Sequence, residues 1–180
     1  MTESGFYGII KHMRYISLAF TGYRTEKLPF EPTKENLTAL KEKIMSAAEN
    51  EIRAGVKYFM SGVCRGSDLI AADAVLTLRE KYDVELWCAV PFKNHRITIP
   101  KNELELYDKV CKNANGVVVL YKQDADGADF GRLYNERNRF MVNRCDGLIA
   151  VCEEKEILPG GTKNTVDFAL CAGKKVIYIL

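Results

Sequence analysis

The fold is set out in residues 15–60, which read YISLAFTGYRTEKLPFEPTKENLTALKEKIMSAAENEIRAGVKYFM. Two short apolar runs, 15–20 and 56–60, flank a longer segment whose apolar residues recur every three or four positions, as on one face of an α-helix. Thr33 suits the N-cap of that helix, and Gly55 ends it because glycine enters the left-handed backbone region without steric cost. The pattern predicts a strand–helix–strand unit.

The same alternation continues to the end of the chain. Its strands are continuously apolar, which requires cover on both faces of the sheet and favours parallel pairing. With right-handed crossovers, the sequence predicts an α/β, Rossmann-like, doubly wound fold with a mainly parallel sheet of about six strands and helices on both faces. Beyond residue 60 we expect strands at 84–90, 116–121, 148–151 and 176–180, and helices at 68–82, 102–113, 130–144 and 162–172.

Length and composition limit the class of protein. The 180 residues are 47% hydrophobic and 28% charged, as in an ordinary globular protein. We expect one domain over 1–180, with 1–14 as a loose N-terminal segment. The net charge of +2 is too small to indicate nucleic acid, so we expect no nucleic-acid partner. No apolar run is long enough to span a membrane and no export signal is visible, so the chain is expected in the cytoplasm.

The cysteine pattern gives no sign of a metal site or of a disulfide framework. Six cysteines form no C-x-x-C pair, and the two histidines stand far apart, so we expect no metal and no cofactor. Most of the cysteines lie in or beside apolar segments and are expected to be reduced and buried. Cys64, in a glycine-rich loop, is the one thiol that we expect to be exposed and reactive.

Candidate binding residues follow the ends of the strands, where ligands bind in doubly wound sheets. After the first strand, Gly22 allows close approach of a ligand to the backbone, next to Tyr23, and Arg24 offers a planar group for a phosphate. The alternative is a plain turn with a surface arginine.

The loop after the second strand contains two glycines, Gly62 and Gly66, on either side of Arg65. A helix follows at once, and the amides of its first turn suit an anion. Ser67 or Asp68 would cap this helix in the alternative interpretation, and Asp68 would otherwise contact a ribose hydroxyl. The loop matches neither a Walker motif nor G-x-G-x-x-G.

The loop after the fifth strand gives the strongest local signal. Gly160 and Gly161 open a helix, with Thr162, Lys163 and Thr165 within reach, so that backbone amides would hold a phosphate. The alternative is a glycine-rich turn with a threonine cap.

The helix expected at 130–144 carries the charged run NERNR. Arg137 shares a helix face with Met141, and Glu136 shares one with Arg139. Such a face can line the cleft, which makes Glu136 and Arg137 candidate ligand-binding residues. A solvated, salt-bridged helix is the alternative.

Four segments together resemble the SLOG superfamily, and YpsA-like proteins most closely. They are NERNRFMVNRCDGLIAV (135–151), PGGTKNTVDFAL (159–170), SGVCRGSDLIAADAVL (61–76) and FTGYR (20–24). The superfamily includes the LOG phosphoribohydrolases and the Smf/DprA DNA-processing proteins. The resemblance implies a Rossmann-like fold that binds a nucleotide or nucleotide-derived ligand, here as a sensor or regulatory module, and LOG-like relatives imply a possible homodimer.

The LOG resemblance implies an alternative function, a nucleoside-monophosphate N-glycosidase. Arg137 matches the catalytic arginine of the E-R-K-x-x-M pattern. Without a gap, the glutamate of P-G-G-x-G-T-x-x-E falls on Asp167, which makes Arg137 and Asp167 the candidate catalytic pair. If Thr165 is matched to the motif threonine instead, Phe168 takes that position and the carboxylate is absent. Smf/DprA proteins imply a third function, single-stranded DNA binding along Lys11, Arg14, Arg24 and Arg65.

Overall fold

The computed structural model describes residues 16–125 and 129–180, and the N-terminal segment considered above lies outside them. Strands and helices alternate as predicted, with two added 3-10 turns, η1 (Thr25–Lys27) and η2 (His95–Thr98). The strands are β1 (Ser17–Gly22), β2 (Tyr58–Ser61), β3 (Glu85–Phe92), β4 (Gly116–Tyr121), β5 (Gly147–Val151) and β6 (Lys175–Tyr178). The α-helices are α2 (Lys34–Arg53), α3 (Ser67–Leu78), α4 (Lys101–Asn113), α5 (Phe130–Arg144) and α6 (Gly161–Cys171).

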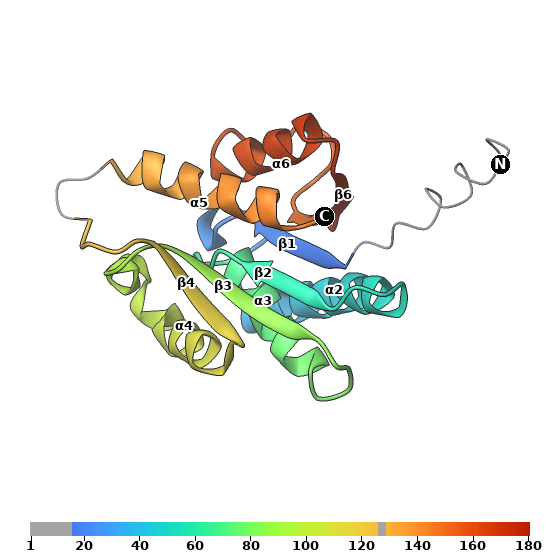
Figure 1. Cartoon of the computed structure of the whole chain (residues 1–180). Coiled ribbons are helices and arrows are strands. Elements are labelled where there is room, and N and C mark those ends of the chain that lie inside the picture. Colours follow the sequence, from blue (N-terminus) through green and yellow to red (C-terminus); the bar gives the residue numbers. More distant parts are fainter. Residues whose placement is uncertain (1–15, 126–128) are drawn as a thin grey trace, which may run out of the picture.

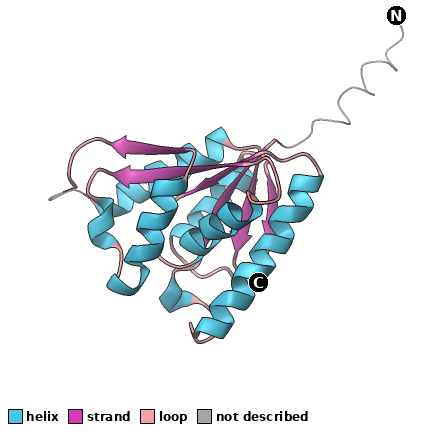
Figure 2. Cartoon of the chain, turned by 90° about the horizontal axis from the view of Figure 1, so that it is seen from below, coloured by secondary structure: helices cyan, strands magenta, loops and turns pink. Residues whose placement is uncertain are grey.

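The strands form a single sheet in the order β4-β3-β2-β1-β5-β6, and every neighbouring pair is parallel. Helices α2, α3 and α4 cover one face and α5 and α6 the other (Figure 1). Viewed from below, the strands fan out across a twisted sheet (Figure 2). This confirms the doubly wound α/β prediction. The winding reverses beside β1, so the ends of β1 and β5 open a crevice of the kind that binds ligands in such folds.

Two apolar clusters form the core, one on each side of the sheet. The larger cluster joins β1 and β2 to α2 and α3, and includes the stacked rings of Phe20 and Phe59. The smaller cluster lies beneath α5 and α6, around Met141 and Val166. The last strand, β6, is covered by its own sheet and by these clusters, since its alternate side chains pack against one cluster or the other.

Local signals place the ends of α2 as predicted. The Thr33 side chain accepts a hydrogen bond from the Asn36 amide, and Gly55, with φ of 114°, follows the C-terminus of the helix. Several other boundaries differ from the predictions by one to four residues. Helix α3 ends at Leu78 rather than at residue 82, and β3 continues through Pro91. Proline is tolerated there because β2 pairs with β3 only as far as Cys88, so the nitrogen of Pro91 has no partner strand on that side.

The cysteines are less uniformly buried than predicted. Cys88, Cys145 and Cys152 are buried, whereas Cys64 and Cys111 are partly exposed. Cys171 is exposed because it lies in the last turn of α6, on the outer surface.

Candidate ligand-binding cavity

A cavity of about 240 Å³ opens where β1 and β5 end. Its wall is built from the segment after β1, the β2–α3 loop, the inner face of α5 and the start of α6. The lining residues are Thr21, Gly22, Tyr23, Arg24, Glu26, Lys27, Cys64, Asp68, Tyr134, Arg137, Asn138, Leu158, Pro159, Gly160, Gly161 and Thr162. The glycine-rich turns after β1 and β5 therefore meet at one place.

The start of α6 presents amides to this cavity. Gly160 is the N-cap, with φ of 139°, and the amides of Gly161, Thr162 and Lys163 belong to the first helical turn, where the helix supplies no acceptor. None of the three has a hydrogen-bond acceptor among the described residues. The hydroxyl of Thr162 does not cap the helix but donates to the Gly22 carbonyl oxygen over 2.8 Å. This bond fixes the helix start against the end of β1.

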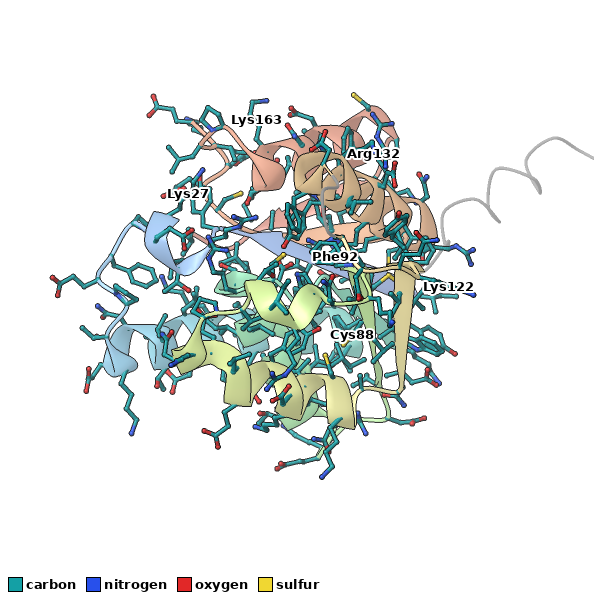
Figure 3. The ribbon with its side chains drawn as sticks, turned by 90° about the vertical axis from the view of Figure 1, so that its left-hand side faces the viewer. Lys27, Cys88, Phe92, Lys122, Arg132 and Lys163 are labelled. Atoms are coloured by element: carbon teal, nitrogen blue, oxygen red, sulfur yellow. The ribbon has the colours of Figure 1, made fainter. Side chains whose placement is uncertain are left out.

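The loop that leads into α6 is held from the opposite side of the cavity. The Lys27 ammonium donates to the Pro159 carbonyl oxygen over 3.2 Å, beside this loop (Figure 3). The Leu158 amide donates to the Tyr23 hydroxyl over 3.0 Å. Tyr23 is 2% exposed, and burial raises the pKa of its hydroxyl. It therefore acts as a neutral anchor of the loop.

Arg137 enters the cavity wall from α5 and is 4% exposed. Its Nη1 lies 3.3 Å from Asp68 Oδ2 and its Nη2 lies 3.1 Å from Cys64 Sγ. Its Nε has no hydrogen-bond partner among the described residues. Such an unpartnered, buried donor carries a large desolvation cost.

Asp68 is the buried carboxylate of the cavity. Burial raises its pKa, and the Arg137 charge opposes this shift. Contrary to the prediction, Asp68 does not cap α3, whose N-cap is Gly66. Burial also raises the pKa of the Cys64 thiol, so Cys64 is not the activated thiol that its loop position predicted.

Tyr134 carries two guanidinium groups over its ring. The centre of the Arg24 guanidinium lies 5.5 Å from the ring centroid, and that of Arg137 lies 5.8 Å from it. The Tyr134 hydroxyl donates to Thr98 Oγ1 over 3.3 Å, which fixes the ring. The Arg24 side chain makes no hydrogen bond or ion pair with any described residue. Its position is set by the tyrosine ring.

The start of α3 is not available as an anion site, which corrects the prediction for the second loop. The Gly66 amide donates to Glu103 Oε2 over 2.7 Å, and the Ser67 amide and hydroxyl both donate to the Tyr23 carbonyl oxygen. Arg65 does not line the cavity and pairs with Glu26 at 2.6 Å. A carboxylate from α4, distant in sequence, thus occupies the place expected for a ligand.

Gly62 also lies outside the cavity lining, and it serves a different purpose from the one expected. A Cβ atom on this residue would lie 1.1 Å from Arg137 Nη1. The absent side chain makes room for the guanidinium and leaves it beside Asp68.

Three further predicted residues lie outside the cavity lining. Glu136 is exposed and pairs with Arg132 at 3.0 Å, while the buried Thr165 hydroxyl donates to the Gly161 carbonyl oxygen within α6. Asp167 is about half exposed and pairs with Lys163 at 2.7 Å. Figure 3 shows Lys163 and Arg132 on the outer side of α6 and α5. Asp167 therefore does not line the cavity that Arg137 lines, and their pairing as catalytic residues stays a prediction.

Sequence reasoning missed several lining residues, for two reasons. Tyr134 lies three residues before Arg137 and four before Asn138, so helical spacing could have identified both. Lys27 and Glu26 lie in the 3-10 turn η1, for which no signal was recognised. The other missed residues are Thr21, Cys64, Leu158 and Pro159.

The described residues contain neither a membrane-spanning helix nor a metal-binding cluster. Across 16–125 and 129–180, no helix is long and apolar enough to cross a membrane. The same ranges contain no group of three or more histidine, cysteine or acidic side chains arranged to hold a metal ion.

The fold is also found in a solved structure. It belongs to a study of the single-stranded DNA binding mode of DNA processing protein A from Helicobacter pylori, and aligns with a TM-score of 0.59 at 18% sequence identity. The alignment covers 92% of this chain and 65% of that one, so this chain spans about two thirds of the length of its structural neighbour. At this level of identity the likeness concerns the fold alone.

Sequence comparisons are more specific. The chain is 25% identical over 151 residues to UPF0398 protein OB1025 of Oceanobacillus iheyensis, covering 83% of this chain and 79% of that protein. It is 24% identical over 156 residues to a UPF0398 protein of Macrococcus caseolyticus, covering 85% and 84%. The model of the YpsA family, described as the YspA SLOG family, matches residues 18–174. The chain therefore belongs to the YpsA family of SLOG proteins, as its motifs predicted.

Proposed function

We propose that this protein binds a nucleotide or nucleotide-derived ligand in the cavity, as a sensor or regulatory module. A phosphate group of the ligand would lie between the first-turn amides of α6 and the Arg137 guanidinium. The observation that carries the proposal is the buried Arg137 side chain, with an unpartnered Nε, which lines the same cavity as those amides. Amides at a helix N-terminus and a guanidinium are both strong partners for phosphate oxygens.

The test removes one amide without disturbing the helix. Gly161 is the first residue of α6, a position at which proline is tolerated because its missing N–H has no helical acceptor. Gly161→Ala is the matched control, since it keeps the amide and its Cβ would lie 3.8 Å from the nearest atom, Asn138 Nδ2, an ordinary contact. We expect Gly161→Pro to bind AMP and ADP roughly tenfold or more weakly in calorimetric titration, as for a lost charge-assisted hydrogen bond.

The control variant separates the loss of the amide from the effect of a side chain at residue 161. Gly161→Ala should bind within about threefold of the natural chain, because its amide is retained. Absence of binding by the natural chain to any nucleotide in the panel would contradict the proposal. Equal affinities of the proline and alanine variants would remove α6 from the site.

Catalysis is not part of the proposal. The carboxylates that line the cavity are Asp68 and Glu26, and each already pairs with an arginine, Arg137 and Arg65 respectively. The carboxylate that the LOG resemblance implied, Asp167, lies outside the lining. We therefore expect no release of free base from nucleoside monophosphates.

Single-stranded DNA is the second candidate ligand. The Helicobacter pylori protein named above is described as binding it, and Arg24 and Lys27 of this chain have no carboxylate partner among the described residues. Arg65, expected on a DNA path, is instead paired with Glu26, and Lys11 and Arg14 lie outside the described residues. A DNA site would give oligonucleotide affinity that falls steeply with salt. Tight nucleotide binding without such affinity favours the small ligand.

A further inference from the structure

We infer that the ligand carries two linked phosphoryl groups, the second of which is bound by Arg24 and Lys27. Its chemical class is then a nucleoside diphosphate or a diphosphate-linked nucleotide, rather than a nucleoside monophosphate. The inference rests on the proposed function and adds to it the kind of phosphate group that the cavity takes.

The first step is the balance of charge around the cavity. Three cationic side chains line it, Arg24, Lys27 and Arg137, together with two carboxylates, Asp68 and Glu26. Asp68 pairs with Arg137, and both are buried. Glu26 is engaged by Arg65, which does not line the cavity. Arg24 and Lys27 are therefore left without a carboxylate partner among the described residues.

The second step is that the positive groups gather at two places. At one, Lys27 reaches the loop before α6, with its ammonium 3.2 Å from the Pro159 carbonyl oxygen and 3.4 Å from where a Cβ of Gly160 would lie. This ammonium thus stands beside the free amides of the α6 start. At the other, Arg24 and Arg137 share the ring of Tyr134.

The third step concerns the surroundings of the Arg24 guanidinium. This guanidinium is partly buried, contacts the same Tyr134 ring as that of Arg137 and has no hydrogen bond to a described residue. A cation partly withdrawn from water without a counter-ion carries a desolvation cost. The Tyr134 ring offsets part of this cost. A single phosphate at the α6 amides would leave Arg24 unpaired, whereas a second phosphoryl group would engage its planar donors.

The test compares ligands that differ by one phosphoryl group. We expect the natural full-length chain to bind ADP roughly tenfold or more tightly than AMP, and inorganic pyrophosphate more tightly than phosphate. In the double variant Arg24→Gln, Lys27→Met the ADP:AMP affinity ratio should fall to within about threefold, because ADP affinity falls much more than AMP affinity. The matched control, Arg132→Gln with Lys112→Met, removes one exposed arginine and one exposed lysine outside the cavity lining and should keep the natural ratio.

The outcomes separate the inference from the proposed function. AMP and ADP binding with equal affinity would overturn the inference and leave the proposed function intact. An unchanged ADP preference in the double variant would overturn the assignment to Arg24 and Lys27. If none of the four probes binds, the proposed function fails and the inference fails with it.

Discussion

The guanidinium of Arg137 occupies the space in which a side chain of residue 62 would lie, since a Cβ on Gly62 would be 1.1 Å from Arg137 Nη1. Gly62 immediately follows β2, and Arg137 comes from α5, which covers one face of the sheet. Their contact lets the guanidinium reach Asp68 across the end of the sheet, where it forms the buried wall of the cavity. The geometry of the site thus depends on a glycine that contributes no group to the ligand.

Gly62→Ala should displace Arg137 from Asp68 and so leave two buried charges unpaired. Separating a buried ion pair costs about 3–5 kcal/mol, and we expect a loss of unfolding free energy of this order in urea denaturation. Nucleotide affinity should fall as well, because Arg137 moves. Gly161→Ala, a glycine substitution with space for its Cβ, serves as control. Equal stability of the two variants would show that Arg137 does not depend on the Gly62 gap.

We expect the buried His95 to lower the unfolding free energy of the protein in acid. It is fully buried among the rings of Phe92, Tyr107 and Tyr134, and neither ring nitrogen has a hydrogen-bond partner among the described residues. Burial lowers its pKa from 6.5 to about 3. Between these two pKa values the unfolded chain therefore binds a proton that the folded chain does not bind. The contribution of neutral His95 to the unfolding free energy is fully present above pH 6.5 and is lost as the pH falls toward 3.

The size of this effect at pH 5 follows from the shift. At pH 5 the solution lies about 1.5 units below the histidine pKa of the unfolded chain. The unfolding free energy is then lower than at pH 7 by roughly 2 kcal/mol. His95→Phe should remove that part of the pH dependence while retaining the aromatic packing. Urea denaturation at both pH values provides the measurement. A variant with the same pH dependence as the natural chain would show that His95 does not titrate in this way.

Glu103→Ala should destabilise the β2–α3 loop. Glu103 accepts hydrogen bonds from the Gly66 amide at 2.7 Å and from the Thr25 hydroxyl at 2.8 Å. Their loss is expected to lower the unfolding free energy by about 1–3 kcal/mol, since charge-assisted bonds to a partly buried amide are broken. Glu105→Ala, at an exposed position on the same helix, should change it by no more than about 0.5 kcal/mol. Similar losses in both variants would argue against the role of Glu103.

Asp167→Ala should leave nucleotide affinity unchanged within about twofold. Asp167 pairs with Lys163 on the outer surface of α6, where an ion pair contributes about 0–1 kcal/mol. Titration with ADP checks this expectation. A large loss of affinity would place Asp167 in the site and revive the LOG-like alternative.

The sequence predicts the fold well because the fold rests on local periodicity. The apolar runs of β1 and β2 and the helical spacing of α2 each fit within one segment, and Thr33 and Gly55 mark boundaries through their own chemistry. The sequence wrongly places the end of β3 before Pro91. Whether a strand can contain this proline depends on the length of the neighbouring strand β2.

The candidate site is only partly predictable from the sequence. Gly22, Gly160 and Gly161 are found because they follow strands that end at one edge of the sheet. The start of α3 carries the same local signal, yet Glu103, thirty-seven residues away from Gly66, satisfies its amide. No local pattern reveals such a partner. Likewise, Asp167 matches a motif by counting but lies one turn too far along α6, beyond the cavity lining.

The central claim is that a phosphate lies between the α6 start and Arg137, and a crystal structure of the full chain soaked with ADP tests it most directly. We expect phosphate oxygens within hydrogen-bond distance of the Gly161 and Thr162 amides and of the Arg137 guanidinium. Phosphates bound elsewhere on the protein, with these groups left unengaged, would contradict the account.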